Sequence, residues 1–331
     1  MTHGTEAGYT PSCVPLVTIR TRRAALLTDD GVSVDAIYES YAGPAREAEP
    51  PSAVVIAHGF TGSWQRPAVR RVAAALRAHA AVISFSLRGH GASGGLSTVG
   101  DREVLDVAAA VRWARLLGHA RVATVGFSLG GAVVLRHAAL CREPGHPLVS
   151  DAPEGAPPSG GDIAHDENGP RGAADRSSRA LAAPGRTPGA GVHARGTQAH
   201  TDAVVAVSAP ARWHYRGTPP MRRVHWAIDR PEGRLVARYG LRTRVDPHRW
   251  NPVPLAPFAA VPLIAPTPLL VVHGDRDPYF PLDHPRMLAA AGDPSSTDLW
   301  IEPGVGHAEN AMDAGLLERI GAWAARAAAG G

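Results

Sequence analysis

Short uninterrupted apolar runs alternate along this chain with longer segments of helical periodicity. The runs are of strand length and lie at 53–57, 81–85, 122–125, 203–207 and 269–272. A run without polar alternation fits a strand that is covered on both faces, as in a parallel sheet. The helical patterns lie at 68–78, 102–117, 129–141, 285–291 and 312–328. This alternation predicts an α/β fold, with right-handed crossovers, a mostly parallel central sheet and helices on both faces.

Further apolar runs lie before and after this alternation. Those at 16–20 and 34–41 are expected to form antiparallel strands, and a last strand is expected around 298–301. The final helical pattern places Leu316 and Ile320 at helical spacing, which forms a face for packing onto a sheet.

The alternation is interrupted twice, and the two interruptions differ in composition. Residues 142–200 hold 10 glycines, 8 prolines and no aromatic residue, so they can bury little apolar surface and are predicted to be disordered. Residues 211–261 hold six of the chain's eighteen aromatic residues and are predicted to form an ordered cap. The expected organisation is one α/β domain, made of 1–141 and 201–331, with the small cap after its sixth strand and the insertion after the helical pattern 129–141.

Composition argues against several classes of protein. The formal charge is +4, but the basic residues are scattered among 30 acids, so no nucleic-acid partner is expected. Two distant cysteines, Cys13 and Cys141, are too few for a disulfide framework or a cysteine zinc site. No export signal is visible, and the longest charge-free run, 251–272, holds six prolines that a membrane span would not tolerate. The sequence therefore predicts a cytoplasmic protein without a membrane span.

The pattern Gly-x-Ser-x-Gly occurs twice, around Ser128 and around Ser93. A nucleophilic serine in this pattern needs a tight turn between a strand and a helix, because the turn projects its hydroxyl and brings a helix N-terminal amide toward the reaction. Ser128 follows the run 121–125 and precedes the helical pattern 129–141, whereas no helix follows Ser93. Ser128 is therefore the predicted nucleophile, and Ser93 is predicted to be a loop residue.

With these residues the chain resembles the α/β-hydrolase superfamily, most closely its esterase, lysophospholipase and serine-aminopeptidase-like branch. Five motifs carry the resemblance in the family's order: His58-Gly59-Phe60, Arg88-Gly89-His90-Gly91, the turn Gly126–Gly131, His273-Gly274-Asp275-Arg276-Asp277 with Pro281, and Gly306-His307. The resemblance covers about residues 14–141 and 202–328. It implies the fold and a Ser-acid-His triad, but it leaves the substrate open because this fold hosts many chemistries.

The other triad members are expected in loops that meet at the carboxyl edge of the sheet. A serine hydroxyl needs a base, and His307 lies in a glycine-rich turn between the expected last strand and last helix. In the family's order the acid follows the run 269–272, where Asp275 and Asp277 are the candidates. The family's spacing favours Asp277, and the following Pro278 ends the strand, so Asp275 is interpreted as a turn former that bonds its own backbone. Asp275, or an acid after the sixth strand, is the alternative.

The oxyanion that forms in acyl transfer needs preorganised hydrogen-bond donors. By position these are the backbone N–H groups of Leu129, directly after the nucleophile, and of Phe60. His58, Arg88 and His90 are interpreted as structural residues that hold the adjoining loops.

Metal and nucleotide sites are not indicated. The chain has no His-Glu-x-x-His, no pair of Cys-x-x-Cys motifs, no acidic calcium loop and no Walker loop. The segment 89–94 matches G-x-G-x-x-G, but no helix follows it, so the dinucleotide context is missing. No metal and no cofactor are expected.

The sequence thus predicts a serine hydrolase that cleaves a carboxylic ester, or a similar acyl bond, of a small-molecule substrate through an acyl-enzyme. Three cap residues, Trp213, Trp226 and Trp250, are expected to form an apolar acyl wall; alternatively they only pack the cap onto the sheet. Amidase, peptidase or acyltransferase chemistry on the same triad stays open, as does a non-catalytic ligand-binding relative. The acyl length, the leaving group and the oligomeric state are not determined by the sequence.

Overall fold

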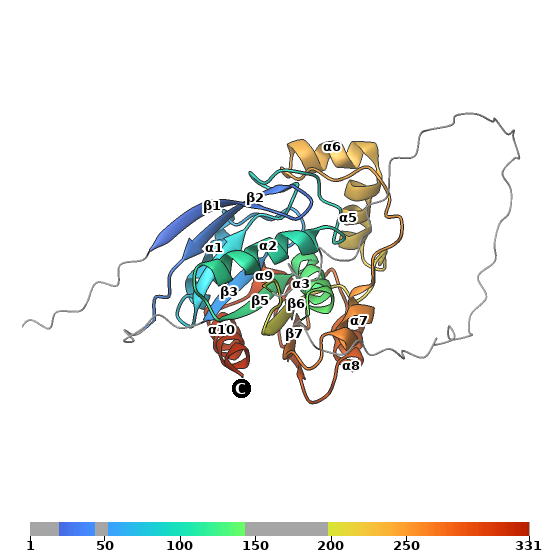
Figure 1. The fold of residues 1–331 in the computed structure, drawn as a ribbon. Coiled ribbons are helices and arrows are strands. Elements are labelled where there is room, and N and C mark those ends of the chain that lie inside the picture. The colour runs from blue at the N-terminus through green and yellow to red at the C-terminus, as the bar shows by residue number, and fades with distance from the viewer. Residues whose placement is uncertain (1–19, 44–51, 143–197, 331) are drawn as a thin grey trace, which may run out of the picture.

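The centre of the fold is one eight-stranded sheet with strand order β1-β2-β4-β3-β5-β6-β7-β8. The computed structural model describes residues 20–43, 52–142 and 198–330 (Figure 1). The pairs β1–β2 and β2–β4 are antiparallel, and the other neighbouring strands are parallel, which confirms the predicted mostly parallel sheet. The strands are β1 (Thr21–Leu27), β2 (Ser33–Glu39), β3 (Ser52–Ala57), β4 (Ala81–Phe85), β5 (Arg121–Phe127), β6 (Ala203–Val207), β7 (Leu269–Gly274) and β8 (Thr297–Glu302).

Helices cover both faces of this sheet (Figure 1). On one face α1 packs against α10, and on the other α2 packs against α3, while α8 contacts β7 and β8. In the described part of the chain, no helix is both long and apolar enough to cross a membrane. The bounds are α1 (Pro67–Leu76), α2 (Glu103–Leu116), α3 (Leu129–Leu140), α8 (Asp283–Ala291), α9 (Ala308–Ala311) and α10 (Ala314–Ala329).

Strand β3 shows why the sequence carries uninterrupted apolar runs. All six of its residues are buried. Val54 and Ile56 lie in a core cluster with residues of α1 and α10, whereas Val55 and Ala57 lie in the cluster with residues of α2 and α3. Because successive side chains of a strand point to opposite faces, a strand that is covered on both sides needs an apolar residue at every position.

Between β6 and β7 the chain forms the cap, residues 211–261. It contains α5 (Pro219–Asp229), α6 (Pro231–Tyr239), α7 (Pro257–Ala260) and the 3-10 helix η1 (Val261–Leu263). Figure 1 shows α5 and α6 apart from the helices that flank the sheet, whereas α7 and η1 pack against α3. The segment is therefore ordered, as its aromatic content predicts.

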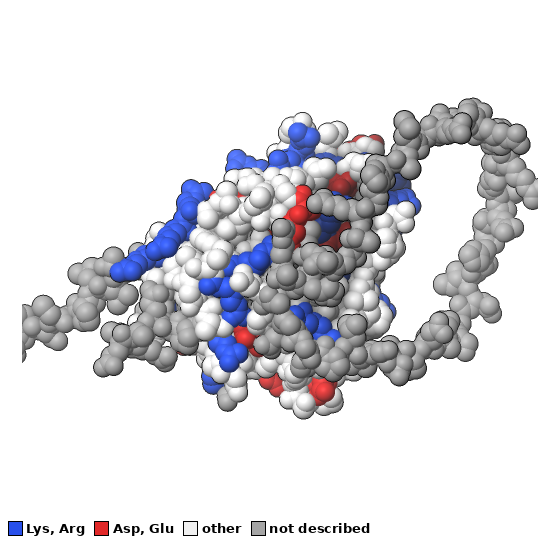
Figure 2. Space-filling model, in the orientation of Figure 1, with Lys and Arg blue, Asp and Glu red and all other residues white. Residues whose placement is uncertain are grey.

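The sequence prediction and the structure differ at the first strand. The expected strand at 16–20 falls on residues outside the described ranges except for Arg20, and the first observed strand is β1, whose residues are largely exposed. Figure 2 shows basic side chains along the edge of the molecule where β1 lies. Charged side chains on an exposed edge strand oppose edge-to-edge association of sheets. Because β1 carries such side chains, it is not an apolar run, and a search for apolar runs misses it. The insertion predicted at 142–200 also falls largely outside the described residues, at 143–197.

Candidate active site

Ser128 stands at a sharp turn between β5 and α3. Its backbone has φ 53° and ψ −115°, a left-handed conformation that is uncommon outside glycine. The turn leaves no room for neighbouring side chains: a Cβ on Gly126 would lie 2.2 Å from the Gly130 carbonyl oxygen, and a Cβ on Gly130 would lie 2.2 Å from that of Ala57. The Ser128 amide donates to the Val207 carbonyl at 2.9 Å and so fixes the turn to β6. Glycine is therefore required at both positions because any side chain would clash with the backbone.

Two hydrogen bonds connect Ser128 to a histidine and an aspartate. Ser128 Oγ lies 2.9 Å from His307 Nε2, and His307 Nδ1 lies 2.7 Å from Asp277 Oδ2. The three residues follow β5, β8 and β7, whose carboxyl ends meet at one edge of the sheet. In the tautomer that fits this geometry, Nδ1–H donates to the carboxylate and Nε2 accepts from the serine hydroxyl.

Asp277 is held as an ionised acceptor. Its side chain is fully buried, and Oδ1 accepts from the amides of Tyr279 at 2.8 Å and Phe280 at 3.1 Å. Burial alone would raise the pKa of this carboxyl, but the hydrogen bond and charge of His307, together with the two amides, lower it below its ordinary value. A charged acid in this position orients the imidazole and stabilises it when it is protonated.

Asp275 has a different partner. It is exposed, and its Oδ1 accepts from the Gly304 amide at 2.6 Å. It therefore joins the loop after β7 to the loop after β8, rather than bonding its own backbone as the sequence interpretation had it. The structure brings Asp277, and not Asp275, to His307.

The loop around His307 is supported by contacts that sequence reasoning missed. The ring of Tyr279 stacks on the imidazole, with a centroid distance of 4.2 Å and an interplanar angle of 30°, and Phe280 lies 5.7 Å away. Ser208 Oγ accepts from the Ala308 amide at 3.1 Å. The only sequence signal for Tyr279 is its place directly after the Asp-Pro step.

The two residues predicted to supply oxyanion donors, Leu129 and Phe60, both line the cavity beside Ser128. Leu129 is the first residue of α3, and Phe60 lies in a turn closed by a hydrogen bond from the Gly62 amide to the Gly59 carbonyl at 3.0 Å. A Cβ on Gly59 would lie 3.3 Å from Ser128 Cβ, so this turn passes directly over the serine. No residue of the described ranges accepts a hydrogen bond from the Phe60 or Leu129 amide. Both amides are therefore unused by the described part of the fold.

Comparison with known proteins agrees with this geometry. The family model described as the alpha/beta hydrolase fold matches residues 52–309. This chain belongs to the α/β-hydrolase family.

Solved structures show the same fold at low sequence identity. The Pyrococcus furiosus esterase Pf2001 is 18% identical, with 97% of each chain covered and a TM-score of 0.59. The esterase domain of a Rhodothermus marinus protein is 17% identical, with 93% of this chain and 99% of that chain covered and a TM-score of 0.52. XC6422 from Xanthomonas campestris, a member of the a/b serine hydrolases without a lid, is 15% identical, with 95% of each chain covered and a TM-score of 0.50. A search of curated proteins returns no match.

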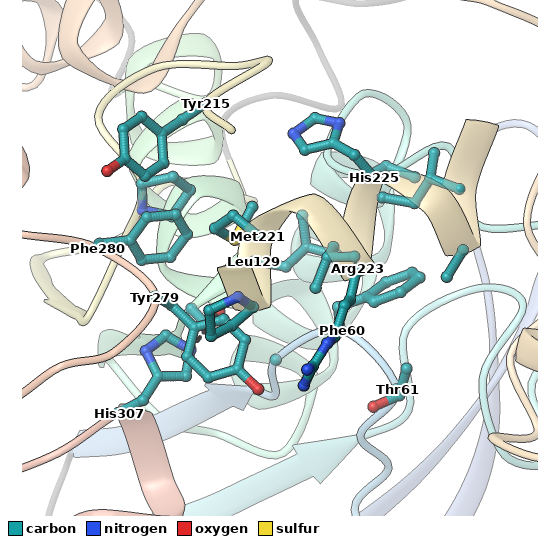
Figure 3. A pocket seen from close by; sticks show the side chains of 18 of the residues that line it. Phe60, Thr61, Leu129, Tyr215, Met221, Arg223, His225, Tyr279, Phe280 and His307 are labelled. Atoms are coloured by element: carbon teal, nitrogen blue, oxygen red, sulfur yellow. Dashed lines mark hydrogen bonds between the residues drawn. The ribbon is translucent and has the colours of Figure 1, made fainter. Parts of the chain in front are cut away.

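The cavity of this α/β hydrolase lies between the cap and the triad. Its volume is about 510 Å³, and both Ser128 and His307 line it (Figure 3). Its apolar lining includes Leu129, Trp213, Met221, Val224, Ile228 and Trp250. Among the described residues, no group of three or more His, Cys, Asp or Glu side chains is arranged to hold a metal ion.

The three tryptophans of the cap are not equivalent. Trp213 and Trp250 line the cavity and contact each other, with ring centroids 5.3 Å apart. Trp226 does not line it, and 45% of its surface is exposed. It lies four residues after Arg222, on the side of α5 that faces away from the cavity. The expected place of Trp226 in the acyl wall is therefore wrong, because the phase of α5 turns this side chain outward.

His58 of the hydrolase is a structural residue in this geometry. Its Nε2 accepts from the Leu87 amide at 3.0 Å, and Nδ1–H donates to the Gly59 carbonyl at 2.7 Å. Burial lowers the pKa of His58 to about 3, so its imidazole is neutral near pH 7. Both nitrogens are occupied in holding the turn that contains Phe60, which leaves neither for proton transfer.

Arg88 and His90 hold the loop after β4. The buried Arg88 guanidinium lies 2.6 Å from Asp30 and 2.8 Å from Asp106. His90 Nδ1–H donates to the Arg88 carbonyl at 2.9 Å, and its Nε2 accepts from the Thr61 amide at 3.3 Å. These bonds give both residues the loop-fixing role that the sequence suggested.

Ser93 lies in the same loop and is buried. Its Oγ–H donates to the Ser86 carbonyl at 2.6 Å, and Oγ accepts from the Asp35 amide at 2.9 Å. The Ser93 carbonyl accepts from the Arg244 side chain of the cap. This second serine of the repeated pattern therefore joins β2, β4 and the cap.

A second acid, Glu309, lines the same cavity as Ser128 and was not foreseen from the sequence. It is buried, and its carboxyl lies near Gly59. Burial raises the pKa of this carboxyl above its ordinary value. Arg71 donates to the Glu309 carbonyl oxygen at 2.6 Å and holds this short helix, α9, against α1.

Proposed function

We propose that this α/β hydrolase cleaves carboxylic esters of small molecules through the triad Ser128, His307 and Asp277. The observation that carries the proposal is the unbroken hydrogen-bond chain from the serine hydroxyl to a buried, ionised carboxylate. A serine hydroxyl is a weak nucleophile unless a base removes its proton, and this chain supplies the base in the required tautomer. The esterase names of two similar structures, from Pyrococcus furiosus and Rhodothermus marinus, favour an ester over an amide.

In the proposed reaction, Ser128 Oγ attacks the ester carbonyl while His307 Nε2 takes the hydroxyl proton. The carbonyl oxygen becomes an oxyanion, and the backbone amides of Phe60 and Leu129 are its donors. His307 then gives the proton to the leaving alcohol, which departs and leaves an acyl-serine. Water, deprotonated by the same histidine, attacks the acyl group and releases the acid. Asp277 stabilises the imidazolium in both halves of the cycle.

The cavity supports an acyl or alcohol group of moderate size. Its volume of about 510 Å³ and its apolar lining suit a hydrophobic substituent. We assign Trp213 and Trp250 to the wall that contacts this substituent, since both line the cavity and their rings contact each other.

Fluorophosphonate labelling with peptide mapping tests the nucleophile, and a panel of 4-nitrophenyl esters of rising acyl length tests the reaction. We expect the label on the peptide that contains Ser128, and both labelling and ester turnover to vanish in Ser128→Ala. Labelling of Ser93, or ester turnover that survives Ser128→Ala, would contradict the proposal.

A further inference from the structure

The cavity beside Ser128 is lined by few charged side chains. They are Arg212, Arg223 and Glu309. Arg212 lies 2.6 Å from Asp283 and is thereby paired. Glu309 is buried, and burial raises the pKa of its carboxyl above its ordinary value. The side chain of Arg223, by contrast, is exposed and makes no hydrogen bond or ion pair with any residue of the described ranges.

Arg223 belongs to the side of α5 that forms the cavity wall. Figure 3 shows its side chain directed from α5 toward the space between Tyr279 and Thr61. The neighbouring Arg222 does not line the cavity and donates instead to the carbonyl of Gly217 at 3.3 Å.

The acid nearest to Arg223 in the sequence already has an ion-pair partner. Asp229, at the end of α5, lies 2.7 Å from Arg216, and its other neighbour is His225 at 3.8 Å. In the part of the chain that the structure describes, no carboxylate of the cap pairs with Arg223.

An unpaired guanidinium at a largely apolar cavity is suited to an anion. It presents planar, parallel N–H donors that match a carboxylate with two hydrogen bonds. Arg223 is itself exposed, so its guanidinium is accessible to an anion that enters the cavity from solvent. A neutral ester would offer the Arg223 guanidinium no ion pair.

We propose that Arg223 binds an anionic group of the substrate, so that the preferred substrates are esters that also carry a carboxylate several bonds from the scissile ester. This inference rests on the proposed esterase function. The carboxylate can belong to the acyl part or to the alcohol part, and the two sources require separate substrates.

Matched ester pairs separate these sources. Mono-4-nitrophenyl pimelate against 4-nitrophenyl heptanoate places the charge on the acyl part, and 4-acetoxybenzoate against its methyl ester places it on the alcohol part. The measured quantity is the ratio of kcat/KM for the charged ester to kcat/KM for the neutral ester. We expect Arg223→Gln to lower this ratio about tenfold for one pair, as the loss of a charge-assisted hydrogen bond does. Arg223→Lys should restore part of it.

Arg222→Gln is the matched control, because it removes the same charge one position along α5 and outside the cavity. We expect it to leave both ratios unchanged. If Arg223→Gln leaves both ratios unchanged, or if Arg222→Gln lowers them equally, the assignment of Arg223 is wrong.

Binding to the Ser128→Ala protein tests Arg223 separately from catalysis. By calorimetry, Arg223→Gln in this background should raise the Kd of monomethyl pimelate about tenfold and leave that of dimethyl pimelate unchanged. Equal affinities of the two proteins for monomethyl pimelate would overturn the inference. Absence of ester turnover in the wild type would instead refute the proposed function, with the binding result still deciding the role of Arg223.

Discussion

The segments 126–130 and 91–95 carry the same five-residue pattern in different surroundings. In the first, the serine has a left-handed backbone, faces a cavity and lies 2.9 Å from a histidine. In the second, the serine is buried and its hydroxyl both donates and accepts within the fold. The pattern by itself therefore specifies only small residues around a serine. Its chemistry depends on whether a helix follows and which loops come to meet it.

Removing each hydroxyl in turn tests whether the two serines have different roles. Ser128→Ala should lower kcat/KM for a 4-nitrophenyl ester by roughly 10⁴- to 10⁶-fold, because the nucleophile is lost. Ser93→Ala should retain kcat/KM within a few-fold, since no atom of Ser93 lines the cavity. The check is steady-state kinetics on folded protein, and comparable losses in the two variants would show that the two segments had been assigned incorrectly.

The second test concerns the acid that orients His307, for which Asp277 and Asp275 are the candidates. Asp277→Asn should lower kcat by roughly 10⁴-fold, because an amide favours the wrong imidazole tautomer. Asp275→Asn is the matched control two residues away, and it should cost far less because its carboxylate holds only the Gly304 amide. Both variants are compared at equal folded fraction. The reverse ranking would make Asp275 the acid.

Acid should destabilise the fold through two buried histidines, His58 directly after β3 and His284 in α8. Burial lowers the pKa of His58 to about 3 and that of His284 to about 4, so the unfolded chain binds protons that the folded chain does not between about pH 6.5 and these values. The free energy of unfolding should therefore fall as the pH falls below about 6.5. The slope is at most about 1.4 kcal/mol per pH unit for each histidine.

Urea unfolding at pH 7, 6 and 5 measures this slope. His58→Gln serves as the comparison, because whatever its stability at pH 7, it should lose the contribution of one proton to the slope. An unchanged urea midpoint between pH 7 and pH 5 would contradict the prediction.

The buried hydroxyl of Ser93 should contribute to stability rather than to turnover. Ser93→Ala leaves the Asp35 amide and the Ser86 carbonyl without this partner, at a cost of about 1–3 kcal/mol in the free energy of unfolding. Denaturant unfolding with Ser128→Ala as the reference gives the difference. A Ser93→Ala protein as stable as the reference would mean that water replaces both bonds.

The smallest expected effect concerns the cap wall above Ser128. Trp213→Ala and Trp250→Ala should each shift the preferred acyl length and change relative kcat/KM by a few-fold, as a change of pocket size does. Trp226→Ala is the control, since its ring lies outside the cavity. A panel of esters from acetate to decanoate records the shift. Identical profiles for the three variants would assign the tryptophans to packing alone.

The sequence predicted those parts of the hydrolase that are determined by residues close together in the chain. The apolar runs fix the strands, and the turn between β5 and α3 is marked by glycines that the backbone requires at 126 and 130. The exposed β1 and the outward direction of Trp226 were missed, because they depend on which face the rest of the chain covers. Arg223 and Glu309 could not be singled out either, since their position at the cavity arises only when the cap and α9 fold onto the sheet.

The order of the strands along the chain also determines when Ser128 of a growing chain can meet its acid and its base. Synthesis delivers Ser128 first, but its acid and base lie 149 and 179 residues later, after β7 and β8. A nascent chain that has completed β5 and α3 therefore carries a serine with no means of deprotonation. In the proposed mechanism, a chain that lacks the loop after β8 lacks the base, so we expect incomplete copies of the protein to form no acyl-serine. The proposed triad is therefore complete only when the whole sheet has been built.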